Sequence, residues 1–259
     1  MLLAINVNNS ETKIGLYRGE QLEAHWRLTT HVARTPDEWG TAVTAFITQA
    51  GRSTQEVRAA ILASVVPPVT QAVCDGVEIA TTRRPVVVDG HSRLPITLDV
   101  DEPLTVGADR ILNTIAAARL FGRDTIVVDF GTATTFDCIT GDGKFLGGVI
   151  MPGVRTAADA LIARTAKLPA TELTAPAHVI GKRTEDCIRA GVLLGAADAV
   201  DGLVRRIKAE WPRPTPPNVV ATGGLASLVA PLTKEIEAVH PDLTLTGLRI
   251  AAQALGLVW

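Results

Sequence analysis

The stretch AINVNNSETKIGLY, residues 4–17, decides the fold, because the chain repeats its pattern later. It runs from a short apolar strand through a polar turn into a second strand. The stretch VVDFGTATTFDCI, residues 127–139, has the same layout at a constant offset of 123 positions. Asn6 then corresponds to Asp129, and Asn8 corresponds to Gly131. Two matching strand–turn–strand segments predict an internal duplication.

Each copy opens one half of the chain with the same order of elements. The first half is predicted as strands 2–7, 13–17, 21–28, 59–68 and 85–90 and helices 36–50, 69–80 and 107–122. The second half is predicted as strands 125–130, 134–140, 144–151, 218–221 and 243–246 and helices 153–166, 184–209 and 247–256, with a further helix after TGG. This pattern predicts an α/β fold of two duplicated domains, residues 1–115 and 116–259. The two polar turns are expected to face a cleft between the domains.

Composition excludes several classes of function. The formal net charge of the 259 residues is −2, so no basic excess indicates binding to nucleic acid or to an anionic membrane. No apolar run has the roughly 20 residues of a membrane span, and the first residues do not resemble a signal peptide. The three scattered cysteines are typical of reduced thiols, which favours a cytoplasmic location.

The two turns are candidate phosphate-binding loops. Small polar turns offer backbone N–H groups and hydroxyls within a compact space, which suits phosphate oxygens. The hydroxyls here belong to Ser10, Thr12, Thr132, Thr134 and Thr135, and Gly131 permits close backbone approach. An ordinary hairpin turn, often rich in Asn, Ser and Thr, is the alternative for either turn alone. The matched pair favours the phosphate-binding interpretation.

Two further motifs are ambiguous when taken alone. In GADR, residues 107–110, Asp109 and Arg110 open a helix and do not face each other. Asp109 could simply stabilise the helix dipole. In TGG, residues 222–224, the glycines between a strand and a helix would let a nucleoside lie against the backbone.

Longer motifs carry a resemblance to a known family. GADRILN, VVDFGTATTFD, LGGVIMPG, GKRT, VVATGGLA and HPDLTLTGLR follow one another in the order and spacing found in type III pantothenate kinases. The chain resembles that family along essentially its whole length. The resemblance implies two ribonuclease-H-like domains, as in the superfamily of acetate and sugar kinases, actin and heat-shock chaperones. It also implies phosphorylation of pantothenate by ATP, with Mg²⁺ and a monovalent cation, K⁺ or NH₄⁺, in a homodimer.

The resemblance implies roles for particular positions. Asp109 matches the general base that takes the hydroxyl proton of pantothenate, and Thr184 matches a pantothenate contact. Asp129 matches the ligand of the monovalent cation. The other substrate positions are Gly107, Ala108 and Arg110, and the ATP positions are Asn6, Val7, Asn8, Asn9, Ser10, Glu11, Thr12, Lys13, Gly131, Thr132, Gly223 and Gly224.

The opening turn departs from the family pattern Asp-x-Gly-Asn-Thr. Asn6 replaces the aspartate and Asn8 replaces the glycine. Asn8 tolerates positive φ better than most residues, but Asn6 lacks the carboxylate that Mg²⁺ prefers. We therefore expect weakened handling of Mg²⁺·ATP. One alternative is a non-catalytic homologue that binds pantothenate or nucleotide as a sensor. Another is a kinase with a shifted substrate, because LPITLDVDEPLTV, residues 94–106, lacks the usual tyrosine and asparagine.

One helix predicts self-association. Small and apolar residues cover most of its circumference between residues 187 and 204, so more than one side must be buried. The dimer interface is therefore expected on this helix, at positions such as Ala197. A central helix in the core of one subunit is the alternative.

Overall fold

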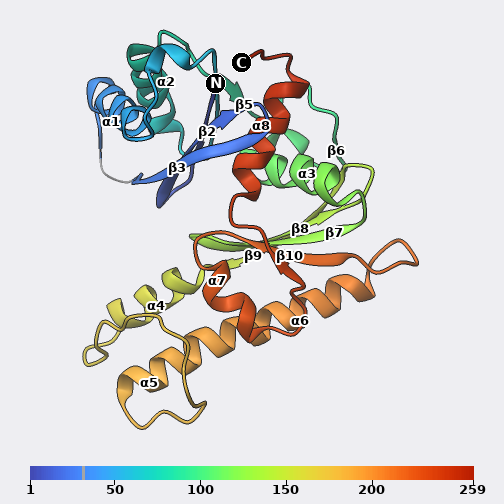
Figure 1. Ribbon diagram of the computed structural model, residues 1–259. Coiled ribbons are helices and arrows are strands. Elements are labelled where there is room, and N and C mark those ends of the chain that lie inside the picture. The colour runs from blue at the N-terminus through green and yellow to red at the C-terminus, as the bar shows by residue number, and fades with distance from the viewer. Residues whose placement is uncertain (31–32) are drawn as a thin grey trace. The chain divides into compact units, whose positions relative to one another are not determined.

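The computed structural model describes residues 1–30 and 33–259. The chain forms two compact units (Figure 1). Unit 1 comprises Met1–Arg119 and Leu243–Trp259, and unit 2 comprises Leu120–Asp242. The structure differs from the expected domain boundaries chiefly at the end of the chain, since residues 243–259 return to unit 1.

Unit 1 holds a five-stranded sheet in the order β3-β2-β1-β4-β5. Strands β1, β4 and β5 are parallel, whereas β2 and β3 form an antiparallel meander with β1. The strands of this sheet are β1 (Leu2–Val7), β2 (Glu11–Arg18), β3 (Gln21–Thr29), β4 (Ala59–Ser64) and β5 (Val86–Val88), and unit 1 also contains the short β6 (Thr97–Leu98), which is not part of it. Its helices are α1 (Pro36–Gln49), η1 (Thr54–Glu56), α2 (Pro67–Thr81), η2 (Pro103–Thr105), α3 (Ala108–Phe121) and α8 (Leu243–Ala254).

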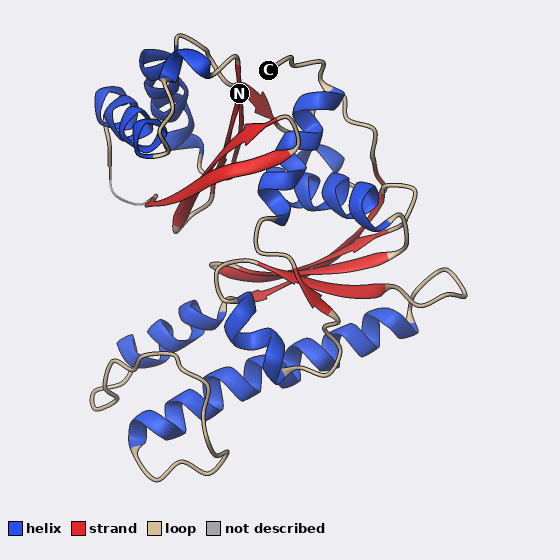
Figure 2. Cartoon of the chain, viewed as in Figure 1, coloured by secondary structure: helices blue, strands red, loops and turns tan. Residues whose placement is uncertain are grey.

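Unit 2 repeats this plan, and its own five strands follow the order β9-β8-β7-β10-β11. Figure 2 draws the strands in red and the helices in blue. They are β7 (Thr125–Phe130), β8 (Ala133–Ile139), β9 (Lys144–Pro152), β10 (Asn218–Thr222) and β11 (Ala238–Val239). The helices are α4 (Val154–Ala163), α5 (Thr184–Arg189), the π-helical turn η3 (Ala190–Leu194), α6 (Gly195–Ala209), α7 (Ala226–Val229) and η4 (Ala230–Leu232).

An irregularity in the meander confirms the duplication. The register between β2 and β3 shifts between Leu16 and Tyr17. The register between β8 and β9 shifts at the equivalent step, between Cys138 and Ile139. A β-bulge is a built-in feature of a strand pair, so its presence at the same place in both sheets supports a common origin of the two units.

The first polar turn is one residue longer than the second. Asn6 pairs with Lys13 in the first hairpin, whereas Asp129 pairs with Thr135 in the second. The constant offset of 123 therefore holds for β1 and β7 but changes by one residue after the turn. Thr12 is thus the counterpart of Thr134, not of Thr135.

Hydrophobic side chains cover both faces of the first sheet. Leu3, Ile5 and Leu62 pack with α1 and α2 on one face. Alternate residues such as Leu2 and Ile61 pack with α3 and α8 on the other face. Each such side chain contributes about 1.5–3 kcal/mol on full burial. In unit 2, strands β7 and β10 pack with α4, α6 and α7. These layers hold the strand ends, and hence the turns, in place.

Most expected elements are confirmed, including the capping box of Thr35 and Glu38 at the start of α1. The strand expected at 243–246 is wrong, because these residues form the first turn of α8. The expected helix 184–209 is present, with the π-helical turn η3 inside it. Within the described residues, no helix is both long and apolar enough to cross a bilayer.

Candidate active site

The first polar turn joins β1 to β2 at the carboxyl edge of the unit 1 sheet. The Asn8 N–H donates to the Glu11 carbonyl oxygen at 3.2 Å, and the Thr30 N–H donates to the Ser10 carbonyl oxygen at 3.0 Å. Asn9 and Ser10 are exposed at the tip. The Thr12 hydroxyl is buried and lies 2.9 Å from that of Thr30. Backbone and hydroxyl groups therefore fix the turn and leave its tip open to a ligand.

Asn6 is buried near the end of β1, with an exposed fraction of 1%. Its side-chain Nδ2 has no hydrogen-bond partner among the described residues. Its neighbours in register are Lys13 on β2 and Ala63 on β4, and neither carries a carboxylate. Because an unsatisfied buried donor is costly, this amide is a group that a ligand could satisfy.

Asp109 lies half-buried in the first turn of α3. One of its oxygens, Oδ1, accepts a hydrogen bond from the Arg110 backbone N–H at 2.9 Å. A Cβ at position 107 would lie 2.6 Å from the same oxygen, so only glycine leaves room for the carboxylate there. Burial raises the pKa of Asp109, and the Arg110 N–H and guanidinium oppose that rise. A carboxylate that is costly to ionise has a stronger tendency to take up a proton.

Val65 connects the turn to the Asp109 helix. The Val65 N–H donates to the Val7 carbonyl oxygen at 3.0 Å, directly before the polar turn. A Cβ at Gly107 would lie 3.6 Å from Val65 Cγ1. The turn and the GADR segment therefore meet at the carboxyl ends of β1 and β4, where ligands of open α/β sheets commonly bind.

The second polar turn packs against the start of α4 in unit 2. The Gly131 N–H donates to the Ala133 carbonyl oxygen at 3.0 Å, within the turn. The Thr132 carbonyl oxygen accepts from the Gly153 N–H at 3.1 Å and from the Thr156 hydroxyl at 2.7 Å. These bonds hold Thr132 through its carbonyl, while the residue itself stays exposed.

The glycines after β10 lie against Asp129. Gly223 has a φ of +96°, and a Cβ there would lie 2.5 Å from Asp129 Oδ1 and 2.6 Å from Phe130 N. The Leu225 N–H donates to the Phe130 carbonyl oxygen at 3.3 Å. Gly224 has nothing within 4 Å of such a Cβ and is exposed. Unit 2 thus brings Asp129, the Gly131–Thr132 turn and the TGG loop together.

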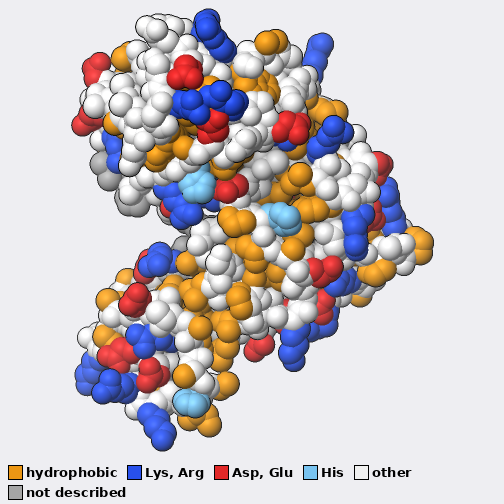
Figure 3. All heavy atoms as spheres, viewed as in Figure 1, with side chains coloured by type: hydrophobic (Ala, Val, Ile, Leu, Met, Phe, Trp, Pro, Cys, Tyr) orange, Lys and Arg blue, Asp and Glu red, His pale blue; other side chains and the backbone are white. Residues whose placement is uncertain are grey.

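Thr184 lies at the start of α5, in a pocket of about 550 Å³. The pocket is mostly apolar, and Val154, Leu161 and Gly195 are among the residues that line it. In Figure 3, hydrophobic side chains gather over the part of unit 2 that holds α4, α6 and α7. An apolar surface of this kind is typical of a binding face.

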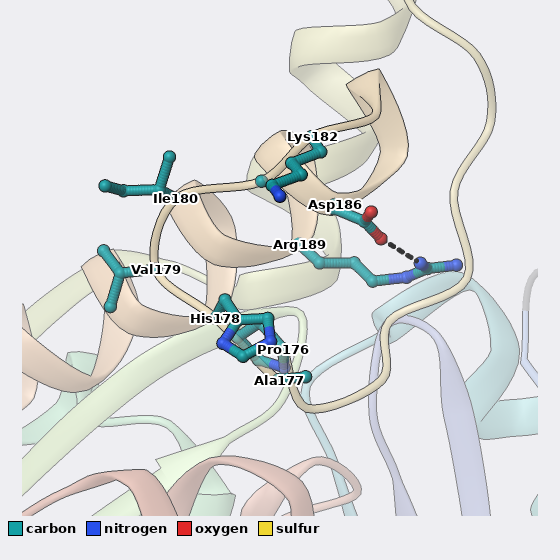
Figure 4. Close-up of a pocket in the computed structure, with 9 residues that line it drawn as sticks. Pro176, Ala177, His178, Val179, Ile180, Lys182, Asp186 and Arg189 are labelled. Atoms are coloured by element: carbon teal, nitrogen blue, oxygen red, sulfur yellow. Dashed lines mark hydrogen bonds and ion pairs between the residues drawn. The ribbon is translucent and has the colours of Figure 1, made fainter.

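A second pocket, of about 940 Å³, lies beside the loop that precedes Thr184 (Figure 4). Figure 4 shows Val179 and Ile180 pointing out from this loop, and they are 75% and 84% exposed. Asp186 and Arg189 form an ion pair of 3.1 Å at its wall. The loop therefore offers apolar and charged groups close to Thr184.

Ala197 does not lie on the outer surface of its helix. It is 1% exposed and packs with Leu193 and Val200 in the core of unit 2. The exposed glycines on this helix are Gly191 and Gly195, which line the Thr184 pocket. The expectation that Ala197 is interfacial is wrong, because the helix turns that side toward its own sheet.

No group of three or more His, Cys, Asp or Glu side chains in residues 1–30 and 33–259 could hold a metal ion alone. Asp129 supplies one carboxylate beside the Gly223 loop, so a cation held there would need further ligands from substrate or water. Asn6 offers only an amide, so the first turn fits Mg²⁺ poorly.

Comparison with known proteins assigns the family. The family model for type III pantothenate kinase matches residues 2–206. The chain belongs to the type III pantothenate kinase family. The enzyme of this name from Thermomicrobium roseum is 42% identical over 98% of both chains. The one from Roseiflexus sp. is 44% identical, over 96% of this chain and 97% of the relative.

Solved structures share the fold of this family member at low sequence identity. Component A of (R)-2-hydroxyglutaryl-CoA dehydratase from Acidaminococcus fermentans superposes with a TM-score of 0.58, at 14% identity, over 98% of this chain and 96% of the other. The activator of 2-hydroxyisocaproyl-CoA dehydratase from Clostridium difficile, solved with bound ADPNP, gives 0.56 at 13% identity, over 98% and 94%. These likenesses support the duplicated two-domain fold.

The motif-based candidates fall into three groups in the structure. The turn of residues 6–13 and Gly107–Arg110 adjoin in unit 1, and Asp129, Gly131, Thr132 and Gly223 adjoin in unit 2. Thr184 lies in the pocket beside α4. Sequence reasoning missed Val65, which links the turn of residues 6–13 to the GADR segment. The prolines at 67 and 68 were the only local signal of a loop there.

Proposed function

We propose that this chain transfers the γ-phosphoryl group of ATP to the hydroxyl of pantothenate, which forms 4′-phosphopantothenate at the start of coenzyme A biosynthesis. Membership of the type III pantothenate kinase family over most of the chain carries this proposal. The residues at the carboxyl edge of unit 1 support it, because they include a positioned carboxylate next to a polar turn.

Asp109 acts as the general base in this proposal. Phosphoryl transfer needs little covalent help from the protein, so positioning of the nucleophile matters most. Gly107 leaves space for the Asp109 carboxylate, and the Arg110 N–H orients it. The raised pKa of Asp109 suits a group that receives the hydroxyl proton of pantothenate. Gly107, Ala108 and Arg110 form the surrounding substrate contacts.

The two polar turns bind the phosphates of ATP. Residues 6–13 offer the open tip of the first turn and the unsatisfied amide of Asn6. Gly131 and Thr132 offer the second turn, whose backbone is fixed by the start of α4. The exposed Gly224 beside Gly223 leaves a flat surface for the nucleoside.

Two cations accompany the reaction. Mg²⁺ arrives with ATP and offsets the charge of its phosphates when bound. Asp129 holds a monovalent cation, K⁺ or NH₄⁺, through its half-buried carboxylate.

We also propose that two copies of the chain form a homodimer through the face that carries Gly191 and Gly195, with pantothenate near Thr184. Three free cysteines fit a cytoplasmic protein.

The buried Asn6 favours a second candidate function. The amide replaces a carboxylate at a position where neither register neighbour is acidic. A chain impaired in this way would bind pantothenate or nucleotide as a sensor without turnover. The positioned Asp109 opposes this alternative, because binding alone does not require a base.

ADP release measured with and without pantothenate tests the proposal, in K⁺ and in Na⁺ buffers of equal ionic strength. We expect release that depends on pantothenate and is much faster in K⁺. Pantothenate binding without ADP release would establish the sensor instead. Equal rates in both salts would refute the cation role of Asp129 while leaving the kinase intact.

A further inference from the structure

A polar pocket of about 470 Å³ lies in unit 1, between η1 and the end of α2. Its lining residues are Thr54, Gln55, Val57, Arg58, Ala80, Thr81, Thr82 and Arg83. Arg58 directly precedes β4, so the pocket lies at the amino edge of the sheet. The six residues of β4 span roughly 20 Å, and the candidate active-site residues lie at the opposite edge. The pocket is therefore separate from the phosphate turn.

The charge of this pocket is unbalanced. Two of its lining residues are arginines, and none is acidic. No ion pair or side-chain hydrogen bond of Arg58 or Arg83 is found in the described part of the chain, and both residues are exposed. Burial lowers the pKa of the nearby N-terminal ammonium, Arg58 lowers it further, and Glu56 opposes the shift.

Two arginines close to the pocket, Arg52 and Arg84, are ion-paired, unlike Arg58 and Arg83 within the described residues. Arg52 pairs with Glu23 at 2.8 Å. Arg84 pairs with Asp75 at 3.0 Å and with Glu78 at 2.6 Å. These three acids are thus engaged by arginines outside the pocket, and Glu56, which lies between the lining residues Gln55 and Val57, is 3.9 Å from Arg18. Arg58 and Arg83 thus line one concave site together.

Thr82 adds a backbone observation at the same pocket. Its φ is 58°, and it is the one non-glycine residue with positive φ in residues 1–30 and 33–259. Glycine or asparagine normally ends a helix in this conformation, and a β-branched residue is an outlier there. Such strain concentrates at ligand sites. Here it keeps a hydroxyl-bearing residue at the pocket wall, next to Arg83.

We propose that this pocket, which we call the Arg58–Arg83 pocket, binds a small molecule that carries a phosphate group. Guanidinium groups pair with phosphate oxygens through two parallel hydrogen bonds, and two of them match the charge of a phosphate dianion. The volume falls in the range of about 300–1,000 Å³ typical of small-molecule sites. The proposal is independent of the kinase assignment, because no catalytic candidate lines the pocket.

Calorimetric titration of the full chain with pyrophosphate, at constant ionic strength, tests the proposal. Arg58→Gln combined with Arg83→Gln should weaken one saturable binding event by about tenfold or more, since each lost charge pair is worth several-fold. Arg84→Gln is the matched control, because it removes a neighbouring arginine that is already ion-paired. We expect it to change the affinity less than about twofold. Binding at the phosphate turns contributes equally to all variants.

An unchanged affinity in the double variant would overturn the proposal, as would a wild-type dissociation constant above roughly 10 mM. A second measurement avoids variants altogether. In the wild-type protein, pyrophosphate should shift the Nε–Hε nuclear magnetic resonance signals of Arg58 and Arg83 and leave that of Arg84 in place. Shifts confined to other arginines would place the anion elsewhere and contradict the proposal.

Discussion

Asp109 combines a functional position with an energetic cost. Burial raises the pKa of its carboxyl group, so ionisation at neutral pH opposes folding. For a raised pKa, the stabilising contribution is complete at low pH and is lost as the pH rises through the folded-state value. The ionised Asp109 carboxylate destabilises the folded protein at neutral pH, and yet Gly107 leaves room for it. This combination is typical of a catalytic group.

Asp109→Asn should therefore lower turnover by about 10²–10⁴-fold, because the amide cannot accept the hydroxyl proton. The same change should leave the midpoint of thermal unfolding at pH 7 unchanged or raised, and this advantage over the wild type should shrink as the pH falls. Turnover and thermal melts on the same preparations check both parts. Asp101→Asn, at an exposed position nearby, is the control. Full turnover in Asp109→Asn would remove this residue as the base.

Asn6→Asp tests the departure in the first turn. The change restores a carboxylate at nearly constant volume, and the register neighbour Lys13 can offset its burial. We expect a lower apparent KM for ATP at each Mg²⁺ concentration, or a gain in rate approaching about 10²-fold, the scale of one electrostatic contact in such a site.

Asn9→Asp makes the same charge change at the exposed tip of the turn and serves as the control. The measurement is the apparent KM for ATP across a Mg²⁺ titration. Indistinguishable curves for wild type and Asn6→Asp would show that the asparagine is not a defect, and that the chain has adapted to its loss of charge.

At the scale of single residues, the motifs predicted the positions of the site residues better than they predicted which side chains are buried. GADR and DFGTA placed Asp109 and Asp129 at strand and helix ends, where the structure has them. The residue pattern did not decide whether Ala197 faces the core or a partner, because small residues occur on both sides of that helix. Burial depends on which side packs on the sheet, and a helix that is small all round leaves this undecided.

At the scale of elements, the β10–α7 loop depends on one of its two glycines. Gly223 has positive φ and lies against the Asp129 side chain and the Phe130 backbone, whereas Gly224 has open space around it. The Phe130 backbone cannot rotate away from an added methyl group. Adjacent residues of one type therefore have different roles.

Gly223→Ala should destabilise the protein by about 2–4 kcal/mol, from the sum of overpacking and backbone strain. It should also raise the KM for ATP, because the loop would be displaced from Asp129. Gly224→Ala should change the free energy of unfolding by less than about 0.5 kcal/mol. Urea unfolding of both variants gives the comparison, and equal effects would mean that the loop is not held as described.

Element type was predictable where one periodicity dominated. The meanders and α1 followed from alternation and from a capping box. The sequence LTLT at 243–246 alternates like a strand but forms the start of α8. Leu243, Thr244 and Leu245 are all buried there, so the helix packs on several sides and hides its period. Tertiary packing decided this segment.

At the scale of the whole molecule, the duplicated strand order was predictable and the path of the chain was not. Both meanders were predicted from the sequence, and the five strands β1–β5 of unit 1 follow the same order as their counterparts β7–β11 of unit 2. Reading the halves in sequence assigned residues 243–259 to the second domain. Leu248, Ala251 and Ala252 instead pack in the cluster that covers one face of the unit 1 sheet. Only long-range hydrophobic contacts specify that return.

The helix face that carries Gly191 and Gly195 predicts that two chains associate. Gly195 is exposed, lines the Thr184 pocket and has nothing within 4 Å of an added Cβ. Gly195→Glu should therefore not disturb the unit itself, since glutamate favours a helix over glycine by roughly 0.5–1 kcal/mol. We expect it to convert dimers to monomers in light scattering, because it buries an unpaired charge between chains. Arg206→Glu, farther along the same helix, should leave the dimer intact. A dimer in Gly195→Glu, or a wild-type monomer, would contradict an interface on this face.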